Sequence, residues 1–312
     1  MGAPFPNIFQ DKKGLGVSFK MFVQLLLSGL VIGGIYGLIA LGYSLIYKAS
    51  GLMSFAQGDL LTLGAFLGLT FYKILGLPFA VSLILTIIIS FLLGMSIERI
   101  IIRVLLARNV MPIYIVLATI AVSYVVQNGA MLTWGSNTQY FPPIFEKIGS
   151  ITIFGRQVQV EYAFCIILAC ISMLILNIFM NYTRIGTAMR ASALNPMAAS
   201  ACGINVSTSR GITWGLSAGL AALGGLLMGP IYGVYVMLGA TIGRKGFASA
   251  VIGGYGNMIG AVVGALILGI TETFIAGYVS STYKDMIAYG LLLLFLFVRP
   301  TGIFNERALA DE

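Results

Sequence analysis

The chain alternates long apolar runs with short polar breaks, and this pattern predicts an all-α polytopic membrane protein. Backbone polar groups inside a bilayer must bond within their own segment, so continuous apolar runs of about 20 residues predict helices. A β-barrel would instead show short segments of alternating polarity. About eight hydrophobic segments are present, and they cover residues 21–47, 52–72, 79–98, 112–134, 161–180, 211–236, 246–279 and 285–298.

Two of these segments do not read as single uninterrupted helices. The sequence Ser54–Asp59 interrupts the second segment near its start, and Gly253–Asn257 interrupts the run 246–279, which is too long for one span. We therefore predict two broken or re-entrant helices. Both breaks are followed by glycines spaced four apart, which are Gly64, Gly68, Gly260 and Gly264. This similarity indicates an internal duplication with the same topology in each half, as is common in transporters; a chance likeness of glycine-rich stretches is the alternative.

The arginines predict the orientation in the membrane. Cytoplasmic loops carry an excess of Lys and Arg. Placing three basic regions in the cytoplasm puts eight arginines inside, which are Arg99, Arg103, Arg108, Arg184, Arg190, Arg210, Arg299 and Arg307, and leaves Arg156 and Arg244 elsewhere. The loop 135–160 then faces outward. For the first part of the chain, a cytoplasmic N-terminus is favoured, with residues 48–72 entering the bilayer partway and returning; an outward N-terminus is the alternative.

Composition supports the membrane assignment and narrows the function. Hydrophobic residues make up 59% of the 312 residues and charged residues 9%, with a mean hydropathy of +0.98, whereas globular domains carry about 25% charged residues. The net charge of +8 is spread between apolar runs, which indicates a lipid bilayer as partner and no nucleic acid. The chain has no histidine and three unpatterned cysteines. We therefore expect no catalytic residues, no metal and no cofactor.

Polar side chains at membrane depth are costly, so each is a candidate for a solute path. The candidates are Gln57, Asp59, Lys245, Tyr255, Asn257 and Glu272. Two alternatives give Asp59 and Lys245 no transport role: they form a structural ion pair, or both lie at the membrane interface. The apolar segments contain no series of carboxylates that could pass protons from one to the next.

The basic region 184–210 contains a predicted short helix. Asn195 occupies the N-cap, Pro196 the first helical position, and Gly203 follows the end. A helix of about two turns is marginal alone in water, so it must pack on its own bundle or dock on a partner. The candidate docking residues are Asn195, Pro196, Met197, Ala198, Ala199 and Gly203.

These residues also carry a family resemblance. Ala198-Ala199 followed by Gly203 resembles the Glu-Ala-Ala motif, with its later Gly, of ABC importer permeases, although Met197 stands in the place of the Glu. Nearly the whole chain resembles the LivH-type branched-chain amino acid permeases. The stretches that carry this resemblance are Tyr36–Tyr43, Gly51–Asp59, Ser96–Arg99, Ala250–Gly256, Tyr283–Asp285 and Arg299–Gly302. Departures are Gln57, where many members carry His, and an N-terminal extension.

The resemblance implies a permease subunit of an ABC importer for branched-chain or related small amino acids, forming half of the translocation pathway. It also implies four kinds of partner chain: a second homologous permease, two cytoplasmic ATPases and an extracytoplasmic solute-binding protein. The location would be a bacterial or archaeal cytoplasmic membrane. The chain would divide into an N-terminal extension (1–20), a permease domain (21–302, with the coupling loop 184–210) and a cytoplasmic tail (303–312).

One sequence feature agrees with the implied presence of separate ATPase chains. The chain lacks the Gly-x4-Gly-Lys-Ser/Thr phosphate loop, so ATP hydrolysis is expected in partner chains. Two other transport functions stay open: a permease for urea, amides or other small polar solutes, and an ion-coupled secondary transporter or channel, which needs no docking helix. A membrane enzyme is the third alternative, and the absence of histidine and of paired carboxylates argues against it.

Overall fold

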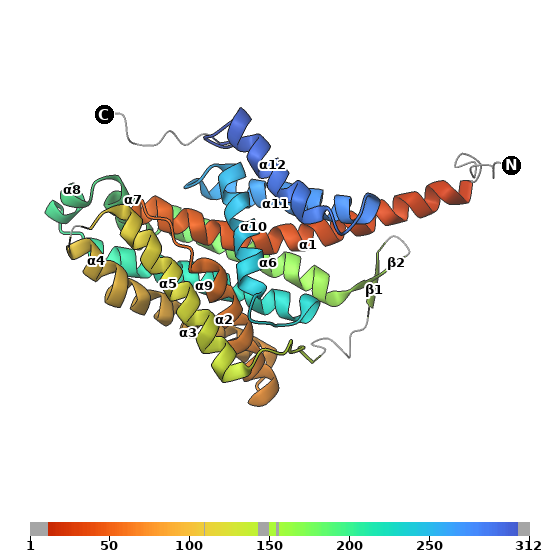
Figure 1. Ribbon diagram of the computed structural model, residues 1–312, viewed down its shortest axis with the longest axis horizontal. Helices are drawn as coiled ribbons and strands as arrows, with labels where there is room; N and C mark the ends of the chain where they lie inside the picture. Colours follow the sequence, from red (N-terminus) through yellow and green to blue (C-terminus); the bar gives the residue numbers. More distant parts are fainter. Residues whose placement is uncertain (1–11, 109, 143–149, 154–155, 305–312) are drawn as a thin grey trace.

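The computed structural model describes residues 12–108, 110–142, 150–153 and 156–304, which are mostly helical (Figure 1). Within these residues, six helices are long and apolar enough to cross a membrane. They are Met21–Ser50 of α1, Phe79–Ala107 (α3, η2 and α4), α5 (Pro112–Trp134), α6 (Val160–Tyr182), α9 (Val206–Tyr232) and α11 (Met258–Tyr278). The predicted all-α membrane fold is therefore confirmed, while the predicted count of about eight segments is not, since six helices meet this length and hydropathy.

The remaining apolar segments form three shorter helices, which are α2 (Gln57–Leu69), α10 (Leu238–Gly253) and α12 (Lys284–Val298). A π-helical turn, η1 (Thr70–Ile74), extends α2. Helix α2 begins only after the non-helical residues 51–56, and α10 ends at Gly253, before α11 begins at Met258. Both predicted interruptions are therefore present.

Helix α1 (Lys12–Ser50) runs through the bundle from the end that carries the hairpin β1–β2 to the end that carries α7 and α8 (Figure 1). Near its C-terminal end, Ile46 packs in one cluster with Ile102 and Trp214, which lie beside the basic regions. With those regions in the cytoplasm, α1 begins outside. The structure therefore excludes a cytoplasmic N-terminus together with cytoplasmic basic regions, and the charge rule favours the alternative of an outward start.

The segment after α1 crosses the bundle instead of returning. Leu52 lies in the same cluster as Ile102, at the basic end. Thr70, at the other end of the segment, accepts a hydrogen bond of 2.8 Å from the indole Nε1 of Trp134, the last residue of α5. Because the non-helical residues 51–56 cover the first part of this crossing, the 13-residue α2 and the turn η1 suffice for the rest.

The connection between α5 and α6 carries a small antiparallel hairpin. Strand β1 (Ser150–Ile153) pairs with β2 (Arg156–Gln159), with Ser150 opposite Gln159. Of the two predicted terminal segments, residues 1–11 and 305–312 lie outside the described residues, while α1 already begins at Lys12.

Glycine faces allow the long helices to pack closely. Gly33 on α1 lies so near α11 that a Cβ atom there would be 3.0 Å from the Cα of Leu266. Gly94 on α3 is equally tight, because a Cβ atom there would be 2.7 Å from the side chain of Ala218 on α9. In lipid the hydrophobic effect does not drive helices together. Small residues stabilise helix–helix association there because they let the two backbones approach and pack closely.

The helix directions indicate an inverted repeat. Helix α1 is antiparallel to α9, since Gly224 packs near Ile35 whereas Ser217 Oγ, earlier on α9, donates a 2.9 Å hydrogen bond to the carbonyl of Gly42. The units α1–α3 and α9–α11 therefore run in opposite directions, and α10 is the counterpart of α2. The sequence likeness between residues 54–68 and 253–264 suggested a different pairing, of α2 with α11. That pairing does not fit, because α11 is long enough to cross a membrane whereas α2 is a short helix.

Candidate functional site

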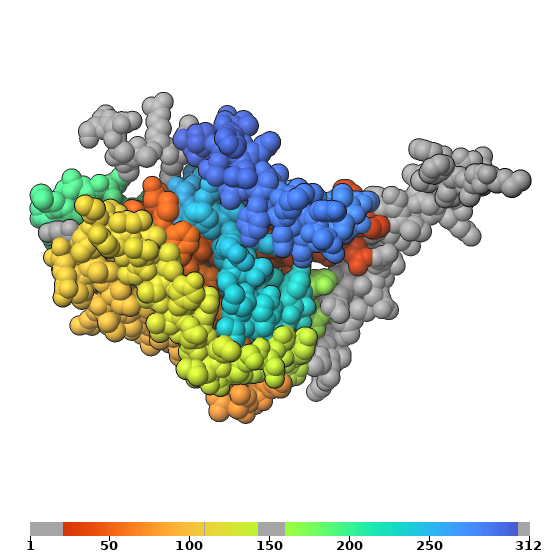
Figure 2. Space-filling view, in the orientation of Figure 1, coloured from red at the N-terminus to blue at the C-terminus, as the bar shows by residue number. Residues whose placement is uncertain are grey.

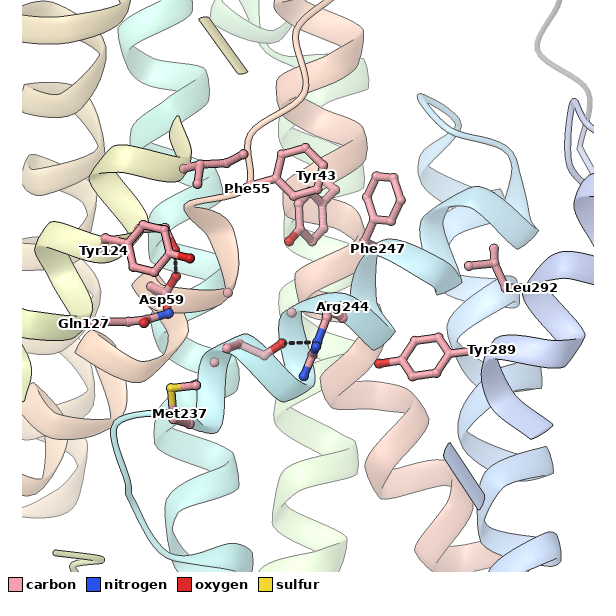
Figure 3. A pocket seen from close by; sticks show the side chains of 16 residues that line it. Tyr43, Phe55, Asp59, Tyr124, Gln127, Met237, Arg244, Phe247, Tyr289 and Leu292 are labelled. Atoms are coloured by element: carbon pink, nitrogen blue, oxygen red, sulfur yellow. Dashed lines mark hydrogen bonds between the residues drawn. The ribbon is translucent and has the colours of Figure 1, made fainter. Parts of the chain in front are cut away.

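A cavity of about 460 Å³ opens between α5, α10 and α12, and residues from α1 and α2 also line it (Figure 3). In the space-filling view, the orange surface of the α1–α2 region is visible between α5 in yellow and α10 in cyan (Figure 2). Pockets of this size hold small organic ligands. The cavity is the candidate site for the transported solute.

The wall of this cavity is built where the first turns of α2 and α10 meet. Gly58 and Gly239 contact backbone to backbone, and a Cβ atom on either would overlap the carbonyl oxygen of the other. The N–H of Gly239 donates to Thr62 Oγ1 at 2.7 Å, which ties the two helix starts together. Only glycine fits at this crossing, because any side chain would separate the two backbones.

Asp59 places a carboxylate on the cavity wall. It lies in the first turn of α2, where a negative charge is favoured by the positive end of the helix. The carboxylate accepts hydrogen bonds from the Ser123 hydroxyl and, at 2.8 Å, from Gln127 Nε2, both on α5 (Figure 3). Although Asp59 is only 2% exposed, its position is fixed at the cavity by these two donors.

Arg244 brings the opposite charge to the same cavity. Its Nε donates to the carbonyl of Ala240 on its own helix at 2.9 Å (Figure 3). Among the ion pairs of the described residues, none joins Arg244 to Asp59. The cavity therefore presents a cation and an anion from different helices that do not neutralise each other.

Aromatic rings line the cavity beside these charges. The ring of Phe247 on α10 lies 5.7 Å from that of Tyr43 on α1 and 5.8 Å from that of Phe55. Such offset and edge-on arrangements are favourable between aromatic rings. All three residues line the cavity, which gives it an apolar surface next to the charged groups.

Of the six predicted path residues, Asp59 lines this cavity, and Gln57 does not. Gln57 is fully buried and bonds in both directions with Ser217 on α9: its Nε2 donates to the Ser217 carbonyl at 2.8 Å, and its Oε1 accepts from Ser217 Oγ at 2.9 Å. In this conformation the Gln57 side chain joins α2 to α9.

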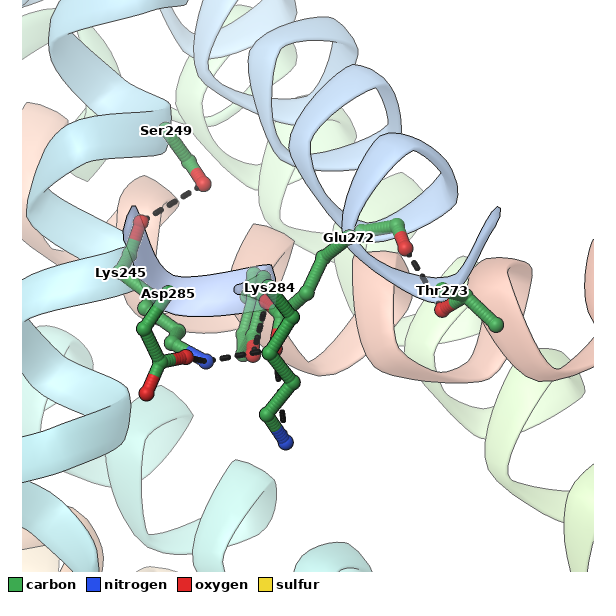
Figure 4. A network of polar contacts seen from close by, with 8 residues as sticks. Lys245, Ser249, Glu272, Thr273, Lys284 and Asp285 are labelled. Atoms are coloured by element: carbon green, nitrogen blue, oxygen red, sulfur yellow. Dashed lines mark hydrogen bonds and ion pairs between the residues drawn. The ribbon is translucent and has the colours of Figure 1, made fainter. Parts of the chain in front are cut away.

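Lys245 and Glu272 are buried and belong to an ion network whose members do not line this cavity (Figure 4). Lys245 Nζ lies 2.5 Å from Glu272 Oε1 and 2.7 Å from Asp285 Oδ1, which joins α10 to α11 and α12. The hydroxyl of Tyr36 on α1 donates to Glu272 Oε2 at 2.9 Å. The alternative ion pair between Asp59 and Lys245 was therefore wrong, because each has other partners.

The last two candidates, Tyr255 and Asn257, lie in the connection between α10 and α11. The Tyr255 ring packs 4.7 Å from that of Tyr47 and 5.6 Å from that of Phe247. Asn257 caps α11 by accepting a 2.9 Å hydrogen bond from the N–H of Gly260. Tyr255 thus supports the aromatic wall from behind, and Asn257 fixes a helix start.

Sequence reasoning missed Arg244, Ser123 and Gln127. Arg244 did leave a signal, since it was one of two arginines outside the three basic regions. Ser123 and Gln127 left none, because nothing local to α5 shows which of its faces meets α2. The described residues contain no group of three or more His, Cys, Asp or Glu arranged to hold a metal ion.

The predicted helix of the basic region is present. Helix α8 (Pro196–Ala201) follows α7 (Arg184–Leu194), and Asn195 Oδ1 caps it by accepting from the N–H groups of Met197 and Ala198, each at 3.0 Å. Gly203 follows with a φ of 81°, which favours glycine. Ala199 is 4% exposed and Met197 84% exposed, so α8 packs on its own bundle by one face and presents the other.

Residues 25–296 match the family described as the branched-chain amino acid transport system permease component. The chain belongs to this family. It is 35% identical to the high-affinity branched-chain amino acid transport permease protein LivH of Escherichia coli K12 over 300 residues, which cover 92% of this chain and 97% of that protein. It is 33% identical to the corresponding protein BraD of Pseudomonas aeruginosa over 298 residues, 91% and 96% of the two chains.

A solved structure shows the same fold as this permease. PsaBC from Streptococcus pneumoniae, in complex with Fab, superposes with a TM-score of 0.51 at 13% sequence identity, covering 91% of this chain and 97% of that one. At this identity the likeness concerns the fold alone. Together with the six long apolar helices, the family membership makes the chain a multi-pass permease of the cell membrane.

Proposed function

We propose that the chain is the permease subunit of an ATP-driven importer for branched-chain or related small amino acids and supplies half of the translocation pathway. The observation that carries this proposal is the cavity beside the start of α2 and α10, which holds opposite charges within a membrane bundle. Short helices that begin inside a bundle form the solute sites of many transporters. The family membership supports the same function.

A second, homologous permease would cover the open side of the cavity. Arg244, Tyr124 and Asn128 are exposed on this side, and the Asp285 side chain is 51% exposed. Arginine at the centre of a membrane helix costs about 2.5–3.5 kcal/mol when it faces lipid. A partner of the same fold would remove these groups from lipid and close the path from the other side.

Two cytoplasmic ATPases would supply the energy, one on each permease. Helices α7 and α8 lie together at one end of the bundle (Figure 1), which the arginines of α7 assign to the cytoplasm, and the exposed face of α8 around Met197 is the proposed docking surface. An extracytoplasmic solute-binding protein would deliver the amino acid at the end that carries the hairpin. Residues 21–302 would form one permease domain, with residues 184–210 as its coupling loop.

Two observations weigh against the other transport functions. The buried carboxylate of Glu272 is held by Lys245 and Tyr36, so it is not free to carry protons or ions. A neutral solute such as urea would bring no charge to either Asp59 or Arg244, whereas a zwitterion brings both, and hydrogen bonds between charged groups are the stronger ones. These features favour an ATP-driven path for a zwitterion.

Reconstitution tests this function. The assembled complex in proteoliposomes should take up leucine only with ATP, and other small amino acids should compete while urea should not. The chain alone, given an ion gradient, should move no solute. Gradient-driven uptake by the chain alone, or ATP-driven uptake of urea but not of leucine, would overturn the proposal.

A further inference from the structure

The two charged residues of the cavity, Asp59 on α2 and Arg244 on α10, line it from different helices. We propose that Arg244 binds the carboxylate of the transported amino acid and Asp59 its ammonium group, so that the permease itself recognises a zwitterion. This inference rests on the proposed function and adds to it the residues and the orientation of the solute.

Asp59 is built to accept one more donor. An ionised carboxylate has about four acceptor positions on its two oxygens. Within the described part of the chain two of them are used: Ser123 donates to Oδ2 and Gln127 to Oδ1. Both donors are neutral, so the negative charge stays uncompensated. An ammonium group in the cavity supplies both the missing donor and the missing charge.

Arg244 offers the complementary group. A guanidinium has five N–H donors, and the bond from Nε to the Ala240 carbonyl uses one of them. The terminal nitrogens remain for a carboxylate, which a guanidinium binds through two parallel hydrogen bonds. Because Nε is tied to its own helix, the direction of the side chain is restricted and the fork is partly preorganised.

Lys245, the neighbour of Arg244 on α10, is not available for this role. It is satisfied by Glu272 and Asp285, within 2.5 Å and 2.7 Å, and it is buried and does not line the cavity. The ring of Phe247, held between those of Tyr43 and Tyr255, leaves an apolar surface beside the charges for an aliphatic side chain. The cavity therefore matches an amino acid with an apolar side chain in three separate respects.

The test uses the purified permease–ATPase complex without its solute-binding protein, so that only the cavity selects. Three probes are compared by the rise in melting temperature that each causes: leucine, leucinamide, which lacks the carboxylate, and 4-methylpentanoate, which lacks the ammonium group. For the wild type, leucine should stabilise most. Arg244→Gln should abolish the effect of 4-methylpentanoate and keep that of leucinamide, and Asp59→Asn should do the reverse.

Uptake provides the second measurement. In the complete system with binding protein, Arg244→Gln and Asp59→Asn should each lower ATP-driven leucine uptake at least tenfold, with Arg244→Lys intermediate. Lys73→Gln, a charge change at an exposed position outside the cavity, should leave uptake unchanged. Each variant is first checked for assembly with its partners.

The outcomes separate this inference from the function on which it rests. If the wild type takes up leucine with ATP but leucine causes no melting shift, or if both variants keep the wild-type ranking of the three probes, the assignment of Arg244 and Asp59 is overturned and the importer stands. If the wild type shows no ATP-driven leucine uptake, the proposed function itself fails.

Discussion

Gly58, at the start of α2, and Gly239, at the start of α10, contact each other backbone to backbone inside the bundle, although 180 residues of chain separate them. The contact leaves no room for a Cβ atom on either residue. It brings together the first turns of the two short helices and so creates the wall from which Asp59 and Arg244 reach the cavity.

Substituting either glycine should destabilise the protein. Gly58→Ala or Gly239→Ala would force the two backbones apart, and overpacking of this kind costs about 1–3 kcal/mol or more. We expect a lower melting temperature in detergent and a loss of transport beyond the loss of folded protein. Gly129→Ala on α5 is the matched control, since a Cβ atom there meets open space. Equal behaviour of the three variants would contradict the contact.

In this conformation the Gln57 side chain should stabilise the fold by joining α2 to α9. Gln57→Leu removes the donor to the Ser217 carbonyl and the acceptor for its hydroxyl, and leaving buried polar groups unpaired costs about 1–3 kcal/mol. Melting curves of Gln57→Leu, Ser217→Ala and the double variant form a cycle. The double variant should lose less stability than the sum of the two single variants, because both remove one shared interaction. Strict additivity would show that the pair is not coupled.

The ion network should show a strong asymmetry between its two lysines. Lys245→Met leaves Glu272 buried without its cation, and breaking a buried pair from one side costs about 3–5 kcal/mol. Lys284 is half-exposed and its Nζ lies 4.0 Å from Glu272 Oε1, so Lys284→Met should cost at most about 1 kcal/mol. Unfolding titrations in mixed detergent micelles compare the two. A larger loss for Lys284→Met would refute the network as described.

A substitution at Met197 should leave the fold of α8 intact but weaken the docking of the ATPase. Met197 is 84% exposed, so Met197→Arg should leave expression and melting temperature unchanged while reducing ATPase association and ATP-driven uptake at least tenfold. Thr187→Arg, exposed on α7 in the same loop, is the control. The buried Ala199 is a poorer probe, because a large side chain there would displace α8 itself. Normal ATPase binding by Met197→Arg would remove α8 from the docking surface.

Local features of the sequence were sufficient for several parts of this protein. The apolar runs predicted a polytopic helical bundle, because helix is the structure that satisfies backbone groups in lipid within one segment. The short helix α8 was predictable for the same kind of reason: Asn195, Pro196 and Gly203 act on neighbouring backbone groups. The interruptions before α2 and between α10 and α11 followed from polar and glycine-rich stretches within apolar runs.

Tertiary structure alone decided how these elements face one another. The direction of α1 was not decided by the sequence, because charge counting assigns a side to a loop but cannot show that residues 51–56 cross part of the bundle without a helix. Of the six polar residues predicted to line the path, Asp59 alone lines the cavity. Their partners also depended on the tertiary structure: Asp59 meets α5, whereas Lys245 meets Glu272 and Asp285. Such pairings depend on close packing between glycine faces remote in the chain, and no local preference encodes them.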